Sequence, residues 1–175
     1  TNTSTINIGV SGDTVNIPSG VTIANAGTAT GFGVAGTEAF SVGLSGNQTL
    51  TNNTWTKITF NSEEFDVGSN FASNKFTAPS AGKYVFTHAI YMWVSGGSDW
   101  ENYSVRFYKN GSGLSSTHSQ FSLQSANMLE VNIPASFILD LSANDYIEVY
   151  AKLSSSGATS RQVDEVSRFQ GYKLA

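Results

Sequence analysis

The sequence of 175 residues contains no cysteine, three prolines and two histidines. Without cysteine the chain has neither disulfide bonds nor a thiolate metal site, so its stability cannot come from such cross-links. Lys, Arg, Asp and Glu make up 13% of the residues, which is about half the usual share in soluble globular proteins. The formal net charge of −4 leaves no basic stripe to neutralise phosphates, and we expect no nucleic-acid partner.

Long hydrophobic runs are also missing. No apolar segment reaches the roughly 18 residues that a membrane-spanning helix needs, and we expect no membrane insertion. Residues 1–5 are all polar and do not resemble a signal peptide, so a secreted form would have lost its signal before residue 1. Gly, Ser, Thr and Asn are abundant, and the apolar share is 39%. This composition is typical of a β-rich extracellular or virion-type protein with one main core.

Residues 82–93 form a long alternation with two apolar faces. One face carries Tyr84, Phe86, His88, Ile90 and Met92, and the other carries Val85, Ala89, Tyr91 and Trp93. A strand in an antiparallel sandwich normally packs one face on the core and leaves the other to water. This strand must be covered twice, and we expect a neighbouring subunit to provide the second cover.

Short alternating segments follow one another from residue 37 onward. The expected strands cover residues 39–44, 55–60, 75–79, 82–93, 103–108, 118–124, 129–141, 146–153 and 167–174. Residues 62–74 and 95–101 are expected to be loops, and Pro134 is expected to bend its strand. No segment has a helical period. Nine or ten strands with this spacing predict a double-sheet sandwich or jelly roll.

Two turns and the strand at residues 146–153 have residue patterns that predict their conformation. Asn110-Gly111 is a hairpin signal, because both central residues of that turn need positive φ. Residues 142–145 form a second tight turn. It leads into a strand with Ile147, Val149, Ala151 and Leu153 on one face and Tyr146, Glu148, Tyr150 and Lys152 on the other. A strand with one apolar and one polar face belongs to a sheet open to water.

Residues 1–36 differ in kind from the remainder. They contain one charged residue, Asp13, and one aromatic residue, Phe32, whereas every Lys and Arg lies at position 57 or later. Their short apolar stripes cannot form a core alone. They either pair with copies of themselves as a stem, lie on a partner as an anchoring arm, or form a flexible linker. We therefore divide the chain into a stem or anchoring arm, residues 1–36, and a head, residues 37–175.

Four motifs occur in order along the head. Residues 75–86 read Lys-Phe-Thr-Ala-Pro-Ser-Ala-Gly-Lys-Tyr-Val-Phe, and residues 105–111 end in Lys-Asn-Gly. Residues 141–145 form a Leu-x-x-Asn-Asp turn, and residues 169–172 read Phe-Gln-Gly-Tyr. This set resembles the complement C1q-like globular heads, relatives of the tumour-necrosis-factor jelly roll, from about residue 39 to the end. Asn144 departs from the glycine that is usual in the family, a mild change because Asn tolerates the left-handed region.

The resemblance implies an all-β, ten-stranded jelly roll that assembles as a homotrimer. It places the central and terminal strands along the three-fold axis. The interface residues that follow are Val85, Ala89, Tyr91, Trp93 and Tyr172. The loop motifs that carry calcium-linked or collagen-linked functions in animal members cannot be matched, so those functions do not transfer. Residues 1–36 have no Gly-X-Y period. Their composition resembles that of stems and anchors of bacteriophage tail fibres and other virion proteins.

Catalytic and metal-binding motifs are scarce, and we expect no enzyme. His88 lies in an apolar stripe, far along the chain from His118, and there is no nucleophile elbow, P-loop or paired-histidine motif. The acidic clusters at residues 63–66 and 99–101 lack the spacing of a calcium loop. They are interpreted as solvated loops, so no cofactor is expected; hard cations such as calcium favour carboxylate loops, but no motif supports a calcium site here.

Aromatic residues near a Gly-rich loop are the remaining indication of a ligand. Planar rings on a solvated surface stack on sugar faces, while nearby carboxylates and amides accept hydrogen bonds from hydroxyls. The outward Tyr108, Tyr146 and Tyr150 have the same chemistry, or else they only cover their own sheet. The candidate ligand-binding residues are Asp99, Trp100, Glu101, Asn102 and Tyr103.

The sequence thus predicts a non-enzymatic, trimeric virion structural protein, most simply a phage fibre adhesin whose head binds host surface glycan. Three copies would add avidity to weak single sites. Its partners are then itself, other virion proteins through residues 1–36, and host polysaccharide. The alternatives are a capsid decoration or cement protein held by its arm, and a secreted bacterial adhesin or matrix protein. The expected location is the outer surface of a virion or, in the last case, the extracellular space.

Overall fold

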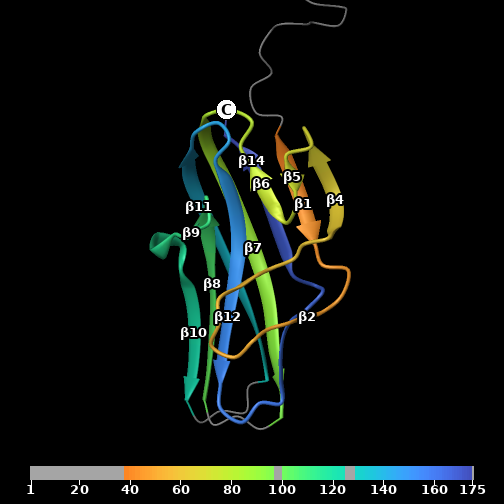
Figure 1. Cartoon of the computed structure of the whole chain (residues 1–175), viewed down its shortest axis with the longest axis vertical. Coiled ribbons are helices and arrows are strands. Elements are labelled where there is room, and N and C mark those ends of the chain that lie inside the picture. The colour runs from red at the N-terminus through yellow and green to blue at the C-terminus, as the bar shows by residue number, and fades with distance from the viewer. Residues whose placement is uncertain (1–37, 97–99, 125–128, 175) are drawn as a thin grey trace, which may run out of the picture. The chain divides into compact units, whose positions relative to one another are not determined.

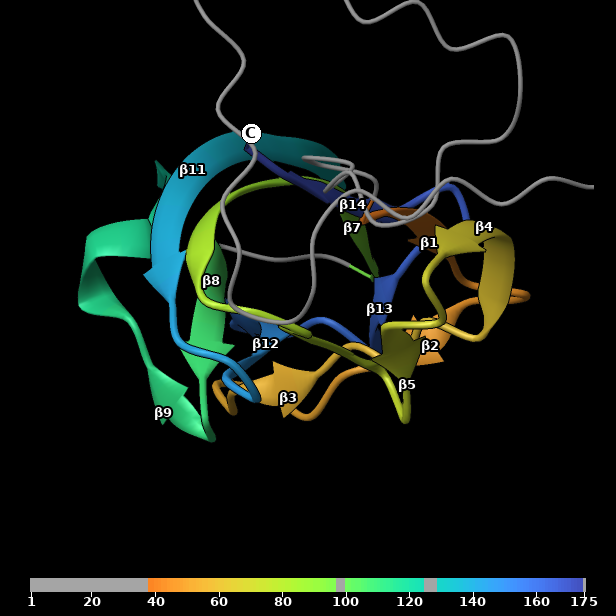
Figure 2. The ribbon, with the colours of Figure 1, turned by 90° about the horizontal axis from the view of Figure 1, so that it is seen from above.

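The computed structural model describes residues 38–96, 100–124 and 129–174, and the predicted stem, residues 1–36, lies outside them. Two antiparallel sheets of seven strand segments each form the two layers of a sandwich (Figures 1 and 2). Sheet A contains β1 (Ala39–Gly43), β2 (Gln48–Thr49), β4 (Ser62–Val67), β7 (Gly82–Ser95), β11 (Glu130–Leu141), β13 (Ser160–Val163) and β14 (Arg168–Lys173). Sheet B contains β3 (Thr56–Lys57), β5 (Phe71–Ala72), β6 (Lys75–Thr77), β8 (Trp100–Lys109), β9 (Ser112–Gly113), β10 (Ser119–Gln124) and β12 (Tyr146–Ser155).

The predicted all-β double-sheet architecture is confirmed. The described residues contain fourteen strand segments and one short 3₁₀ helix, Ser115–Thr117. Four of the strand segments are only two residues long. The predicted number of ten strands therefore describes the longer segments alone.

Several sequence-based boundaries are wrong. Residues 62–74 are not one loop, because β4 pairs with β1 and β5 pairs with β6. The strand expected at residues 55–60 shrinks to β3, and residues 100 and 101 begin β8 instead of ending a loop. The sequence pattern does not predict β13, because only Val163 among its four residues is buried.

Pro134 continues β11 and does not interrupt it. It lies opposite Ala89 in an unbroken register between β11 and β7. Among the described strands β11 pairs only with β7, which makes it an edge strand of sheet A. A proline is tolerated on such an edge because no further strand needs its missing N–H.

The core lies between the inner faces of β7 on one side and β8 and β12 on the other. The predicted inward residues of β7 are each at most 1% exposed: Tyr84, Phe86, His88, Ile90 and Met92. The facing sheet contributes buried residues at every second position: Tyr103, Val105, Phe107, Ile147, Val149, Ala151 and Leu153. Strand alternation therefore predicted the core faces of β7 and β12 correctly.

The glycine of the Phe-Gln-Gly-Tyr motif, residues 169–172, allows an aromatic cluster to pack beneath β14. The ring centroid of Phe40 lies 5.0 Å from that of Phe76 and 4.9 Å from that of Phe169. A Cβ added to Gly171 would lie 2.7 Å from ring atoms of both Phe40 and Phe86. Glycine is needed at this position because the two rings occupy the place of its side chain.

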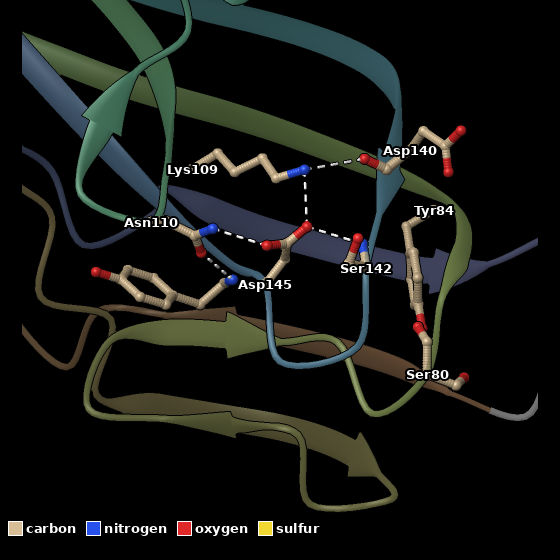
Figure 3. Close-up of polar contacts among 8 residues, drawn as sticks. Ser80, Tyr84, Lys109, Asn110, Asp140, Ser142 and Asp145 are labelled. Atoms are coloured by element: carbon tan, nitrogen blue, oxygen red, sulfur yellow. Dashed lines mark hydrogen bonds and ion pairs between the residues drawn. The ribbon is translucent and has the colours of Figure 1, made fainter.

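The two predicted turns lie side by side (Figure 3). Asn110 and Gly111 have φ of 52° and 78°, which confirms the expected hairpin turn with two positive φ values. Asn144 has φ of 68°, so it adopts the left-handed conformation that the family's usual glycine would take. In the same region the hydroxyl of the buried Tyr84 donates a hydrogen bond to the Ser80 carbonyl oxygen at 2.8 Å.

Asp145 joins these two turns. Its carboxylate lies 2.7 Å from the Lys109 ammonium and accepts hydrogen bonds of 2.7 Å from the Asn110 side chain and from the Ser142 backbone N–H. The Asn110 side-chain oxygen in turn accepts a hydrogen bond of 2.9 Å from the backbone N–H of Tyr146. The Lys-Asn-Gly and Leu-x-x-Asn-Asp motifs are therefore joined by one set of polar contacts centred on Asp145, which we call the polar clamp.

Candidate functional site

The outer face of sheet A carries a row of apolar side chains that crosses five strands. Cross-strand pairing aligns Val67 of β4, Ala39 of β1, Tyr172 of β14, Val85 of β7 and Ile138 of β11. We call these five residues the transverse row. Val67 is 48%, Tyr172 50% and Ile138 62% exposed. Single exposed apolar residues are ordinary, but a contiguous exposed row is typical of an interaction surface.

The neighbouring row on the same face is mostly polar. Ser41, Gln170, Thr87 and Ser136 align across β1, β14, β7 and β11. The Gln170 amide donates to the Ser41 hydroxyl at 3.0 Å, and that hydroxyl donates to the Glu64 carboxylate at 2.6 Å. These polar groups are thus already hydrogen-bonded within one chain, and an interface could cover them without leaving them unsatisfied.

A second apolar area lies beyond the polar row, toward the C-terminal half of β7. It is an open depression of about 790 Å³ whose apolar lining includes Tyr91, Trp93, Leu129 and Val166. Leu129 is 48% and Val166 is 58% exposed. Glu130 lies beside the Tyr91 hydroxyl and raises the pKa of that tyrosine. An apolar centre with a polar rim is the usual anatomy of a protein interface.

The predicted interface residues all lie on this outer face. They are Val85, Ala89, Tyr91, Trp93 and Tyr172; the first four are partly exposed in the single chain and the last is half exposed. Their own chain covers the first four only in part, so β7 keeps some apolar surface on its outer face in the folded head. Their burial in a trimer stays a prediction.

Sequence reasoning missed part of the same surface. Ile138 could have been recognised, because Phe137 and Leu139 face the core and the apolar residue between them must point outward. Val67 and the 48% exposed Phe65 gave no such signal, because their segment was expected to be a loop. Only the pairing of β4 with β1 adds these two residues to the outer face of sheet A.

The structure does not bring the predicted ligand residues together on the surface. Glu101 is 1% and Tyr103 is 0% exposed, so these two side chains point into the core. Burial, followed by the nearby Glu101 carboxylate, raises the pKa of Tyr103. Asn102 faces the other way and donates to the Ser122 hydroxyl at 2.8 Å. Asp99 and the side chain of Trp100 lie outside the described residues.

This arrangement corrects the expectation that Glu101 lies in a solvated loop. Strand alternation in β8 turns Glu101 inward together with Tyr103, so neither can touch a ligand that stays outside the sandwich. A sugar site built on these two residues is therefore not available at the surface of the head.

Neither histidine has the surroundings of a catalytic base. His88 is 1% exposed, and its Nδ1 lies 3.1 Å from the Ile133 carbonyl oxygen. Burial lowers the pKa of His88 to about 4, which keeps the ring neutral inside the core. His118 lies on the far sheet, edge-on to the Trp55 ring with 5.6 Å between ring centroids. The two rings therefore do not form a common site.

The carboxylates of residues 63–66 serve the fold. Glu64 accepts hydrogen bonds from Ser41 and Arg168, which lower its pKa. Asp66 accepts hydrogen bonds from the backbone N–H groups of Asn70 and Phe71 at 3.1 and 2.8 Å. In the described part of the chain, no group of three or more His, Asp or Glu side chains could hold a metal ion. The same residues include no helix that is long and apolar enough to cross a membrane.

The outer face of sheet B holds the three outward tyrosines. Tyr108 and Tyr150 stack with 3.7 Å between ring centroids, and the Lys75 ammonium lies 4.2 Å from the centroid of the Tyr146 ring. The outward direction predicted for these residues is confirmed, since each remains partly exposed. Their neighbours Trp55, Arg106 and Lys152 add an aromatic ring and two positive charges to the same surface.

Known proteins resemble this chain in sequence pattern and in fold. The sequence model of the C1q domain matches residues 39–174. The globular domain of zebrafish complement 1qA protein is 17% identical with a TM-score of 0.53, and the alignment covers 79% of this chain and 97% of that chain. Murine APRIL at pH 8.5 is 10% identical with a TM-score of 0.52, covering 78% and 98%. No curated protein matches the sequence.

Proposed function

Because the chain belongs to the C1q domain family, we propose that it is a non-enzymatic binding head that works as a homotrimer. Its subunits meet through the outer face of sheet A. The outer face of sheet B then points away from the axis and is presented to a partner three times. The family assignment supports a binding role.

The observation that carries this proposal is the transverse row. Its five residues come from five different strands, yet they form one apolar line on a face that the core does not use. Covering apolar surface contributes roughly 25 cal/mol per Å², so leaving three half-exposed side chains in water is costly. Closed rotational symmetry brings the same row from each subunit to a common contact and removes it from water.

The polar row beside it gives the assembly its register. The Gln170 amide donates to the Ser41 hydroxyl and that hydroxyl donates to Glu64, so these bonds inside one chain reduce the cost of covering the two side chains. A slipped arrangement would place the apolar side chains of one subunit against these polar groups. Polar positions inside an apolar interface are known to select one arrangement over its alternatives.

Sedimentation equilibrium of the head at micromolar concentration tests the proposal. The wild-type head is expected to have three times the mass of one chain, and Ile138→Asp or Val85→Asp is expected to reduce it to the monomer mass. Gln120→Asp, an exposed position on sheet B, is the matched control and should leave the trimer intact. A wild-type head that sediments as a monomer contradicts the proposal.

The biological setting of the trimer is a separate proposal. The composition of residues 1–36 supports a stem or anchor on a virion, with the head as a fibre adhesin for host surface glycan. A capsid decoration protein and a secreted adhesin share the same head. If deletion of residues 1–36 abolishes incorporation into particles and glycan arrays stay silent with the intact trimer, decoration replaces adhesion. If no particle contains the protein, the secreted alternative replaces both.

A further inference from the structure

We propose that the outer face of sheet B binds the carboxylate or sulfate groups of an acidic polysaccharide at a site centred on Trp55. This inference names a ligand class for the proposed function and rests on it in one respect. The trimer through sheet A leaves sheet B free and repeats the site three times. The chemistry of the site itself lies within a single chain.

Three groups that carry or can carry positive charge surround the Trp55 ring. The guanidinium carbon of Arg106 lies 4.3 Å from the ring centroid, and the Lys152 ammonium lies 5.3 Å from it. The His118 ring meets the Trp55 ring edge-on at 5.6 Å. These residues come from β8, β12, the segment before β3 and the segment before β10, and all four side chains retain contact with solvent.

The positive charge at this site is not neutralised by the described residues. Neither Arg106 nor Lys152 takes part in any of the four ion pairs of the described chain. The acidic residue of β12 on this face is Glu148, which is 7% exposed and lies 2.7 Å from the Lys57 ammonium. In a protein of net charge −4, unpaired cations gathered around one ring indicate an anionic partner.

The electrostatics around His118 agree with this geometry. Its pKa is lowered by partial burial and then by the positive charges of Arg106 and Lys152. An oxyanion that binds between these groups reverses the last two effects, because it favours the protonated ring. The pKa of His118 should therefore rise when the site is occupied.

Arg106 is held in place before any ligand arrives. Its Nη2 donates to the Tyr108 hydroxyl at 2.7 Å, and its guanidinium carbon lies 4.8 Å from the centroid of the Tyr108 ring. A Cβ on Gly113 would lie 2.6 Å from that guanidinium carbon, so the glycine leaves room for the arginine against β9. A donor group fixed in this way loses little entropy when it binds.

The surroundings favour a sugar polymer over a nucleic acid. Binding to a nucleic-acid backbone uses a stripe of cations along many phosphates, whereas here three groups cluster at one point and the rest of the chain is acidic. The stacked Tyr108 and Tyr150 rings adjoin the cluster, and both remain partly exposed, so they add apolar surface beside the charges for the carbon-bound hydrogens of a sugar. A polysaccharide with widely spaced acidic groups meets both requirements.

The test is calorimetric titration of the wild-type trimer with three defined oligosaccharides: a sulfated heparin fragment, a hyaluronan fragment that carries only carboxylates, and a neutral cellulose fragment of equal length. At least one acidic fragment is expected to bind and the neutral one is not; which acidic fragment binds identifies the group as sulfate or carboxylate. Lys152→Gln should weaken binding about tenfold, the loss expected for one charge-assisted hydrogen bond. The control Lys83→Gln removes a paired lysine on sheet A and should leave the affinity unchanged.

A proton NMR titration of His118 provides the second readout. Its pKa is expected to rise when the acidic fragment is bound and to stay the same with the neutral fragment. Three results would overturn the site. The neutral fragment could bind as tightly as the acidic one, or Lys83→Gln could lose as much affinity as Lys152→Gln. A single-stranded DNA oligonucleotide could also displace the acidic fragment in a way that depends on Lys152. A trimer that binds neither acidic fragment overturns the site but not the trimer. A monomer that binds through Lys152 overturns the proposed trimer but not the site.

Discussion

The Lys109 ammonium lies 2.7 Å from the Asp145 carboxylate, and this contact joins two turns that are far apart in the chain (Figure 3). Both residues belong to motifs that identify the family. Their side chains are largely covered, with 30% and 15% of the respective surfaces exposed. The Lys-Asn-Gly and Leu-x-x-Asn-Asp motifs therefore hold two turns of the jelly roll together.

Asp145→Asn should change how stability responds to acid. Hydrogen bonds from Lys109, Asn110 and the Ser142 backbone lower the pKa of Asp145 from 3.8 to about 2. A carboxylate with a depressed pKa stabilises the fold above its unfolded value, and this contribution is lost as the pH falls from 3.8 toward about 2. Denaturant unfolding at fixed protein concentration should show a smaller loss across this window in the variant. Asp140→Asn, at an exposed position on sheet A, is the control and should behave as the wild type. If the free energy of unfolding falls equally with pH in the wild type and in Asp145→Asn, the role of Asp145 in the polar clamp is contradicted.

His88→Gln should remove a different pH effect. The buried ring has a pKa of about 4 instead of 6.5, so the unfolded chain binds a proton that the folded chain does not. Wild-type stability therefore falls as the pH drops from 6.5 toward about 4, by on the order of 3 kcal/mol. Gln keeps a donor for the Ile133 carbonyl but cannot be protonated, so the variant should lack this slope. Identical slopes in both proteins would show that His88 stays exposed enough to charge freely.

Gly171→Ala should destabilise the head by about 1–3 kcal/mol, the usual cost of overpacking a filled core. The added methyl group has no space, because the rings of Phe40 and Phe86 lie 2.7 Å from its position. Urea unfolding measures the loss. Gly46→Ala is the matched control, since a Cβ there meets no atom within 4 Å. Equal stability of the two alanine variants would show that the core can move aside.

Trp93→Asp should dissociate the proposed trimer while leaving the single chain folded. The side chain lies in the depression on the outer face of sheet A and is partly exposed in one chain. A carboxylate buried there by a partner has no cation to pair with, which costs several kcal/mol per subunit. Sedimentation velocity should show monomers for Trp93→Asp and trimers for the conservative Trp93→Phe. A soluble, trimeric Trp93→Asp protein would remove Trp93 from the interface.

The hairpin turn and the core faces could be predicted because they are local properties. Positive φ at Asn110 and Gly111 follows from the turn type alone. The buried positions of β7 and β12 follow from a period of two along each strand. Glu101 shows the limit of this logic: its polarity suggested a loop, but the strand that begins one residue earlier turns it into the core.

The sequence by itself determined which face each long strand buries, because alternation along a backbone needs no partner. Only the tertiary structure decided which outward residues become neighbours. Val67 and Ile138 belong to one apolar row, and Trp55 and Lys152 belong to one charged site, although each pair is distant in the chain. Such neighbours are set by the register between strands, and register depends on how two whole sheets fill a shared core, which no single segment encodes.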